Sequence, residues 1–437
     1  MQFYVSTIKI YTGHILSFLR IFVLLNYFTT YQFNLFSFSY STAALISTFI
    51  LFGQVDFIIK HYRNNPREII KSTLRILYLT ITFSFFLFIT SVSLSKTSYI
   101  AISLFTLVHF SANILLGLVQ AAYNYSKYSD YYLLRQLISI VSIFVLFIGY
   151  NIRGDSQIIV ISLIESALMM SMFLHVFLKI YNSHKVDSTT NLIIESLHSF
   201  KFTFRYLNKI NYNRLFFGLA AVTRSNCPNI LNSSLFFILP NSTYYLFNIL
   251  NYFKSILLLL AVPYKTSCYY FSSRKSLNRL QSHSNIAVIS IIGSISILFA
   301  LFHYVDLFNL NIFSEITFDD FISEFKARPF SMLNSYRYQI FTLSILIILS
   351  TLLYSLLDSS IYLIMKLSSM IGYSIYCYVY TGIAITMTIL LSISIYSNSP
   401  PIVTIISISY LQLISISIAV LFSNIRNKQF LNKAKSN

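Results

Sequence analysis

Four ionisable side chains lie inside apolar stretches that are long enough to cross a membrane, and they are the residues best placed to do chemistry. Arg20, Arg224 and Lys254 are cations, and Glu165 is the one acid near the middle of such a stretch. A charge near mid-bilayer costs roughly 2.5 to 3.5 kcal/mol unless it faces water or a counter-charge. The three cations favour a hydrated, cationic cavity for an anionic ligand, and cations that snorkel or form structural pairs are the competing interpretation.

Polar neighbours accompany each of these cations. Ser17 falls on the helical face of Arg20, and Arg224 precedes Pro228, which removes a backbone donor and predicts a bent or broken helix. Lys254 stands beside a helical face that carries two asparagines. The predicted substrate-binding residues are therefore Arg20, Arg224, Lys254, Asn248 and Asn251.

Glu165 has two possible roles that the sequence does not separate. Ser162 and Ser166 stand beside it, and an isolated acid within a membrane span is a candidate site for a coupling ion or a proton. Pairing with one of the buried cations would also explain why an acid is retained at this depth. Both alternatives stay open at this point.

No motif indicates catalysis, a cofactor or a metal. Cys227, Cys268 and Cys377 have neither paired nor metal-ligand spacing. The chain has nine glycines and no phosphate-cradling GxxxxGK loop, so a P-loop mechanism of nucleotide hydrolysis is excluded. The net charge of +18 comes from cations spread between apolar segments, so no nucleic-acid partner is expected.

The elements that must position these residues are transmembrane helices. Hydrophobic residues make up 56% of the 437 positions and charged residues 10%, whereas soluble domains carry roughly 25% charged residues. A spanning helix needs about 20 mostly apolar residues. That length predicts an all-α, polytopic membrane protein with about twelve spans. They lie near 11–28, 38–60, 73–94, 98–121, 134–150, 157–178, 214–238, 242–263, 286–304, 338–358, 371–396 and 402–424.

A basic connector divides the chain into two six-helix halves. The predicted organisation is an N-terminal half over 1–178, a cytoplasmic hinge over 179–213, a C-terminal half over 214–424 and a basic tail over 425–437. Most of the 31 Lys and Arg residues fall in the termini and the even-numbered loops. Because short basic loops stay in the cytoplasm, both termini are predicted to be cytoplasmic.

Three stretches carry a resemblance to a known family. Residues 52–62 look like a glycine-containing helix end followed by a basic residue, 117–123 like a glutamine-alanine segment, and 261–267 like a proline near the cytoplasmic face. In these stretches the chain resembles bacterial polysaccharide transporters, the O-antigen flippases (Wzx type) of the multidrug/oligosaccharidyl-lipid/polysaccharide exporter superfamily. The resemblance covers nearly the full length of the chain.

This resemblance implies a flippase of the bacterial inner membrane and not an enzyme. Its substrate would be an undecaprenyl-pyrophosphate-linked oligosaccharide, moved to the outer leaflet by alternating access. The implied partners are that lipid-linked oligosaccharide, membrane lipid, and a polysaccharide polymerase with its chain-length regulator. The alternative is an O-antigen polymerase, a membrane glycosyltransferase that would need catalytic groups on the outer loop 306–337, where Arg328 and Arg337 lie.

Overall fold

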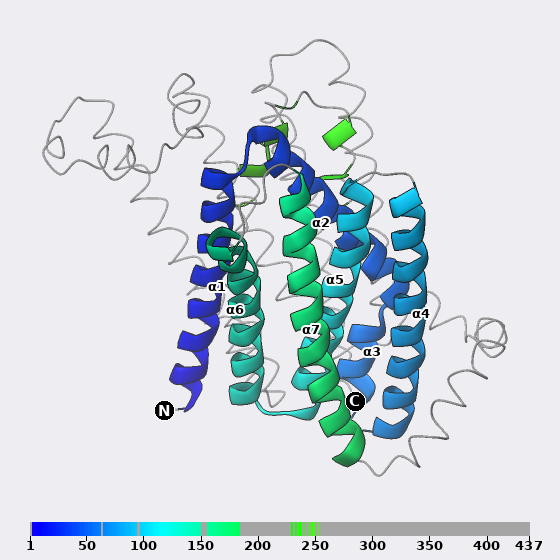
Figure 1. Ribbon diagram of the computed structural model, residues 1–437. Helices are drawn as coiled ribbons and strands as arrows, with labels where there is room; N and C mark the ends of the chain where they lie inside the picture. Colours follow the sequence, from blue (N-terminus) through cyan, green and yellow to red (C-terminus); the bar gives the residue numbers. More distant parts are fainter. Residues whose placement is uncertain are drawn as a thin grey trace, which may run out of the picture. The chain divides into compact units, whose positions relative to one another are not determined.

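The computed structural model describes residues 2–62, 64–93, 97–149 and 155–183, with scattered positions between Asn229 and Tyr252. Within these ranges every regular element is a helix (Figure 1). The helices are α1 (Gln2–Tyr27), α2 (Thr30–Leu51), α3 (Gln54–His61), α4 (Pro66–Ser93), α5 (Thr97–Ala122), α6 (Tyr125–Gly149) and α7 (Ser156–Ser183). The predicted all-α class is confirmed.

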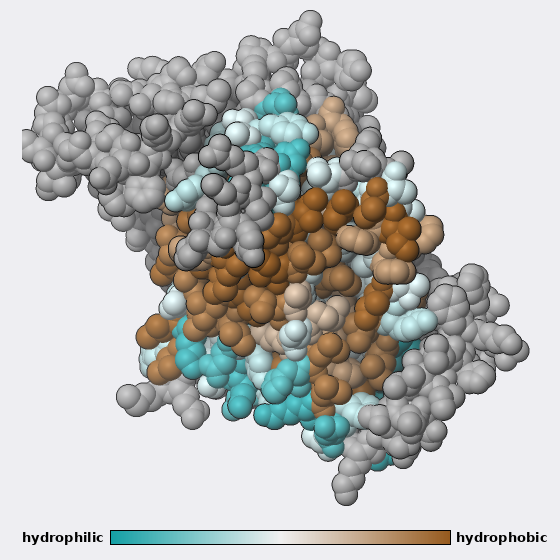
Figure 2. Space-filling model, viewed as in Figure 1, coloured by the Kyte–Doolittle hydropathy of each residue, from teal (hydrophilic) through white to brown (hydrophobic). Residues whose placement is uncertain are grey.

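The described helices have the length and surface of membrane spans. Five of them, α1, α2, α4, α5 and α7, are long and apolar enough to cross a bilayer, and α6 has 25 residues. Figure 2 shows a broad apolar band with hydrophilic residues gathered along its lower edge. Large apolar side chains such as Phe85 and Phe86 of α4 are exposed, as lipid-facing residues are. The chain is a multi-pass membrane protein.

The predicted spans before the hinge correspond to these helices, and each helix starts earlier than the sequence indicated. Predicted spans three to six match α4 to α7, and each of these helices is longer than its prediction. Helix α7 continues through Lys179 to Ser183, so the predicted hinge begins within a helix. The rest of the hinge, the tail and nearly all of the second half lie outside the described residues.

The second predicted span, 38–60, is broken in the structure. Helix α2 ends at Leu51, and Phe52 and Gly53 have φ angles of 43° and 74° before α3 begins. Glycine reaches this left-handed region without a Cβ clash, so Gly53 explains where the helix breaks. The Gln54 side-chain amide then donates a 2.6 Å hydrogen bond to Ser72 Oγ, which fixes α3 against α4.

Helix α5 is the centre of the compact unit that contains α3 to α7, residues 1–20 of α1 and residues 34–51 of α2. It packs against α3, α4, α6 and α7, and most of its side chains are buried. The hydroxyls of Ser103, Thr106 and Ser111 donate to carbonyls of α5 itself. Its buried hydroxyls are therefore satisfied locally, as in other membrane helices.

Helices α1 and α6 run side by side in the same direction. Thr7 contacts the start of α6 through the hydroxyl of Tyr125, and farther along, a Cβ built on Gly13 would lie 3.1 Å from the ring of Tyr132. In Figure 1, α2 and α3 run in the same direction and the other successive helices alternate, so the start of α1 and the end of α7 lie at the same end. The chain therefore crosses the bilayer an even number of times between these two points, as a cytoplasmic N-terminus and a cytoplasmic hinge require.

We expect reporter fusions truncated after Asn65 and Asn124 to report the cytoplasm, and fusions truncated after Thr29 to report the outside. The reason is that positively charged helix ends stay in the cytoplasm, and the start of α4 carries Arg67 and Lys71. Paired phosphatase and fluorescent-protein reporters measure this directly. An outside signal after Asn124 would contradict the orientation of α1 to α6.

Candidate functional site

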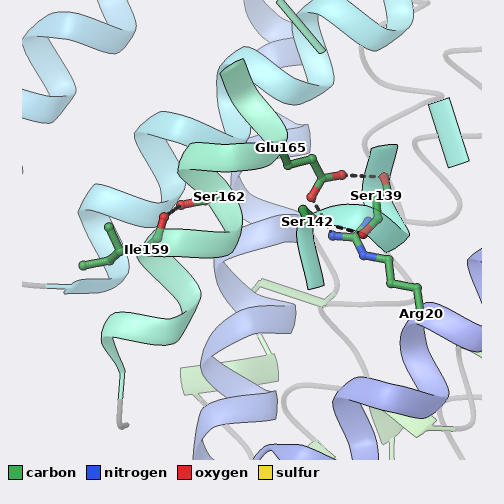
Figure 3. A network of polar contacts seen from close by, with 6 residues as sticks. All are labelled: Arg20, Ser139, Ser142, Ile159, Ser162 and Glu165. Atoms are coloured by element: carbon green, nitrogen blue, oxygen red, sulfur yellow. Dashed lines mark hydrogen bonds and ion pairs between the residues drawn. The ribbon is translucent and has the colours of Figure 1, made fainter. Parts of the chain in front are cut away.

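The central feature of the described helices is a buried ion pair between α1 and α7. Arg20 Nη2 donates to Glu165 Oε2 at 2.7 Å, and the two side chains are only 8% and 1% exposed. From α6, the hydroxyl of Ser139 donates to the other carboxylate oxygen of Glu165 at 2.6 Å. Figure 3 shows the three side chains converging from their helices. The pair neutralises both charges inside the bundle.

Aromatic rings of α2 cover the guanidinium of Arg20. Its central carbon lies 5.5 Å from the ring centroid of Phe36 and 5.3 Å from that of Tyr40. A cation over an aromatic face is stabilised by about 2 kcal/mol or more when it is desolvated. Arg20 is therefore held by a carboxylate and by two rings, which explains how a cation is retained at this depth.

The serines that flank Glu165 in sequence do not bind it. Ser162 donates to the carbonyl of Ile159, and Ser166 donates to that of Leu163 (Figure 3 shows the first of these). Both bonds lie within α7, because a serine hydroxyl reaches the carbonyl of the preceding turn. Ser139, from a different helix, supplies the hydroxyl that the carboxylate accepts.

A second group of polar residues lies beside the ion pair. The ring of His109, on α5, is 4.3 Å from that of Tyr40, and His109 hydrogen-bonds the Tyr40 backbone. Arg135, on α6, interacts electrostatically with both His109 and Tyr132. Tyr132 in turn bonds His14 Nδ1 of α1 through its hydroxyl, at 3.0 Å. Polar side chains of four helices thus meet next to Arg20.

Sequence reasoning missed Arg135 as an interior residue. The predicted span 134–150 placed it at the membrane surface, whereas α6 begins at Tyr125 and holds Arg135 well inside the helix. A signal was present in the tyrosines: Tyr125, Tyr128 and Tyr132 are all buried and follow helical spacing. That spacing indicates a helix that starts before the apolar run.

The predicted site residues fall into three groups. Arg20 and Glu165 are brought together, so the pairing alternative for Glu165 is the one that the structure shows, and its coupling role stays a prediction. Asn248 is 2% exposed and shares a buried helical face with Tyr244 in the second compact unit. Arg224, Asn251 and Lys254 lie outside the described residues. Within the described ranges, no group of His, Cys, Asp or Glu side chains is arranged to hold a metal ion.

Comparison with known proteins shows which fold this is. No protein-family model matches the chain, and no curated protein matches it in sequence. The outward-facing conformation of a multidrug resistance MATE family transporter of the MOP superfamily matches with a TM-score of 0.55 at 10% identity, over 99% of this chain and 96% of that one. The chain has the MATE fold.

Two further solved structures match the chain at similar TM-scores, and one of them is named as MATE. MATE in complex with MaD5 has a TM-score of 0.57 at 12% identity and covers 99% of this chain and 96% of its own. A structure named protein A has a TM-score of 0.60 at 12% identity and covers 98% and 95%. The MATE fold confirms the predicted likeness to the exporter superfamily at the level of fold. The narrower resemblance to O-antigen flippases stays a prediction.

Proposed function

We propose that this protein is an exporter that moves an undecaprenyl-pyrophosphate-linked oligosaccharide across the bacterial inner membrane. The observation that carries the proposal is the MATE fold along 98 to 99% of the chain. The three stretches that resemble polysaccharide transporters supply the substrate class. A polymerase and a chain-length regulator are the protein partners that such a pathway implies.

The substrate imposes an electrostatic requirement on its carrier. A pyrophosphate is anionic, and moving it through hydrocarbon is prohibitive unless a hydrated, cationic site receives it. The residues proposed for that site are Arg20, Arg224, Lys254, Asn248 and Asn251. The polyprenyl tail stays in the lipid. Translocation makes and breaks no covalent bond, so the proposed protein is not an enzyme.

The buried pair supplies a means of coupling transport to an ion. Arg20 is neutralised as long as Glu165 is ionised. If Glu165 takes up a proton, Arg20 loses its counter-charge and attracts an anion more strongly. Because the pair joins α1 to α7 and Ser139 adds α6, the same event loosens contacts among three helices. Proton uptake and substrate binding thereby favour each other.

A second candidate is the export of a small drug-like molecule, favoured by the multidrug transporter among the structural neighbours. The polymerase alternative has no such support, since its loop 306–337 lies outside the described residues.

An assay with purified protein in vesicles distinguishes an oligosaccharide exporter from an exporter of small drug-like molecules. Under a proton gradient, lipid-linked oligosaccharide should change leaflet, as read by its accessibility to an added glycosidase. Vesicles that expel ethidium but leave the oligosaccharide in place would favour the second candidate.

Glu165→Gln is expected to lower oligosaccharide translocation by about tenfold or more, because the amide cannot exchange a proton. Rates are normalised to the protein recovered in the vesicles, and only monodisperse protein is compared. Glu68→Gln, at the first turn of α4, is the matched control and should translocate at the wild-type rate. A Glu165→Gln protein with normal, gradient-dependent translocation would remove Glu165 from the coupling mechanism.

A further inference from the structure

Helix α6 carries a polar stripe on one side and an apolar stripe on the other. Tyr125, Tyr132, Gln136 and Ser139 follow one another at intervals of seven, four and three residues, which places them on one face of the helix. Large exposed apolar residues occupy the opposite side, as on a lipid-facing surface, and they are Leu134, Leu137, Val141, Phe144 and Val145. The polar stripe is therefore turned toward the interior of the bundle.

Helix α1 lies along this polar stripe (Figure 1). Thr7 is 3.5 Å from the hydroxyl of Tyr125. Lys9 pairs with Asp130, and because their side chains are 34% and 48% exposed, water reaches this end of the contact. We call the contact the polar seam and define it by Thr7, Lys9, Gly13 and His14 on α1 and Tyr125, Asp130, Tyr132, Gln136 and Ser139 on α6.

The middle of the polar seam is buried. His14 Nδ1 lies 3.0 Å from the hydroxyl of Tyr132, and the two residues are 7% and 8% exposed. A Cβ built on Gly13 would be 3.1 Å from the ring of Tyr132 and 3.4 Å from Cγ of Gln136. Both side chains of α6 therefore lie against the same point of α1, one helical turn apart.

The polar seam ends at the carboxylate of Glu165. Ser139 lies one turn beyond Gln136 on α6 and donates to Glu165 at 2.6 Å (Figure 3). The helix between Asp130 and Ser139 is about 14 Å long, at roughly 1.5 Å per residue. Polar side chains inside membrane spans are costly and often mark ion pathways or proton relays. A continuous line of them connects the exposed end of the seam with a buried acid.

One buried nitrogen indicates water inside the polar seam. Nε2 of His14 has no hydrogen-bond partner among the described residues, whereas Nδ1 is bonded by Tyr132. Buried polar atoms are normally bonded to protein or to ordered water, and a buried water makes about three such bonds. The polar side chains of the seam offer the further bonds. We therefore expect ordered water beside His14.

We propose that the polar seam carries protons between Glu165 and the end of the bundle at which α1 begins, which is the end predicted to face the cytoplasm. This inference rests on the proposed function, in which Glu165 exchanges a proton. A hydronium ion at the exposed end loses one proton. Each water and hydroxyl of the seam accepts a proton from one neighbour and donates its own to the next. Ser139 gives the last proton to Oε1 of Glu165, which becomes a carboxylic acid.

Ser139 is the group that delivers the proton, because the other partner of Glu165 is a permanent cation. Within the described helices, Glu165 is bonded to Arg20 and to Ser139, and a guanidinium does not lose its proton in proteins. Besides the seam itself, the ionisable groups that adjoin the pair are Tyr40 on α2, His109 on α5 and Arg135 on α6. None of these three is bonded to Glu165.

Time-resolved infrared spectroscopy of the purified full chain in nanodiscs tests this route. After laser release of a caged proton, the carbonyl band of protonated Glu165 should rise, and Glu165→Gln, which lacks the band, assigns it. Tyr132→Phe removes a hydroxyl but keeps the ring beside Gly13. It should slow the rise by about tenfold or more and leave the final height of the band unchanged. Tyr131→Phe, the same change outside the seam, is the matched control and should rise at the wild-type rate.

Gln136→Leu is an independent second variant. It places an apolar side chain beside Gly13 in the middle of the polar seam, so it should slow the band as Tyr132→Phe does. If Tyr132→Phe also lowers the final height, its structure has changed and Gln136→Leu decides. In vesicles that hold the protein in one orientation, acid added on the side where α1 begins should protonate Glu165 faster than acid on the other side.

Four results would overturn this proposal. They are a wild-type protein without the Glu165 band, wild-type rates in Gln136→Leu, equal slowing by Tyr131→Phe, and faster protonation from the opposite side. The assay contains no oligosaccharide, so failure of the proposed function is distinguishable. Protein that protonates Glu165 through the seam but translocates no oligosaccharide would keep the route and remove the exporter function. Normal translocation with wild-type infrared rates in both seam variants would remove only the route.

Discussion

Replacing Glu165 by leucine is expected to lower the free energy of unfolding by about 3 to 5 kcal/mol, because it leaves the charge of Arg20 buried without a counter-charge. Arg20 is 8% exposed, so it has little access to water that could compensate. The two rings of α2 retain part of the stabilisation. Denaturant unfolding of the purified protein in detergent, followed by circular dichroism, measures the difference.

The double variant Arg20→Met with Glu165→Leu is the decisive comparison. Removing both charges together should recover most of the loss, since apolar residues of similar volume replace buried pairs at little cost. The pair Lys9–Asp130 provides a control, because its side chains are 34% and 48% exposed. Lys9→Gln should cost about 1 kcal/mol or less. A double variant no more stable than Glu165→Leu would show that the charges are not energetically coupled.

Replacing Gly117 by leucine should destabilise the packing of α5 against α3 by about 1 to 3 kcal/mol, as overpacking of a dense interior does. A Cβ at position 117 would lie only 3.0 Å from Cγ1 of Val55. In a bilayer, helices associate through close packing, because lipid tails are as apolar as the side chains. The same unfolding assay measures the loss.

Val55→Ala provides the internal test of this contact. Gly117→Ala alone should cost less than Gly117→Leu, and adding Val55→Ala should restore stability, because it removes the very atom that the new Cβ meets. Gly13→Ala is the comparison at another helix pair, where the neighbour is the ring of Tyr132. If Gly117→Leu unfolds like the wild type, α3 does not pack against α5 as described.

Hydropathy and length were enough to predict the helical membrane class and the first six spans, because a bilayer admits few alternatives to a long apolar helix. Helix ends were harder to predict. The break at Phe52 and Gly53 was missed because apolar residues resume after it, at Val55 and from Phe57 to Ile59. The start of α6 was missed because its first turns are rich in tyrosine, serine and charge, which also suit a loop.

The sequence predicted which charged residues belong to the candidate site, but it did not predict which of them pair with one another. Glu165 and Arg20 stood out because each is a charge in an apolar segment. Their pairing depends on how α1 and α7 pack, and single-sequence periodicity contains no information about that. His109 looked like an ordinary packing residue, although its Nε2 atom is buried and has no hydrogen-bond partner among the described residues. Arg135 was missed because an error in one helix boundary moved it to the surface.

The distance along the chain between Arg20 and Glu165 has a consequence for biosynthesis. The two residues are separated by 145 positions, and ribosomes add about 5 to 20 residues per second. Arg20 therefore enters the membrane on the order of 10 s before its carboxylate has been made. During that time α1 carries a charge that lacks its counter-charge, at a cost of roughly 2.5 to 3.5 kcal/mol. The full stability of the first helix in the membrane is thus reached only when the seventh has been made.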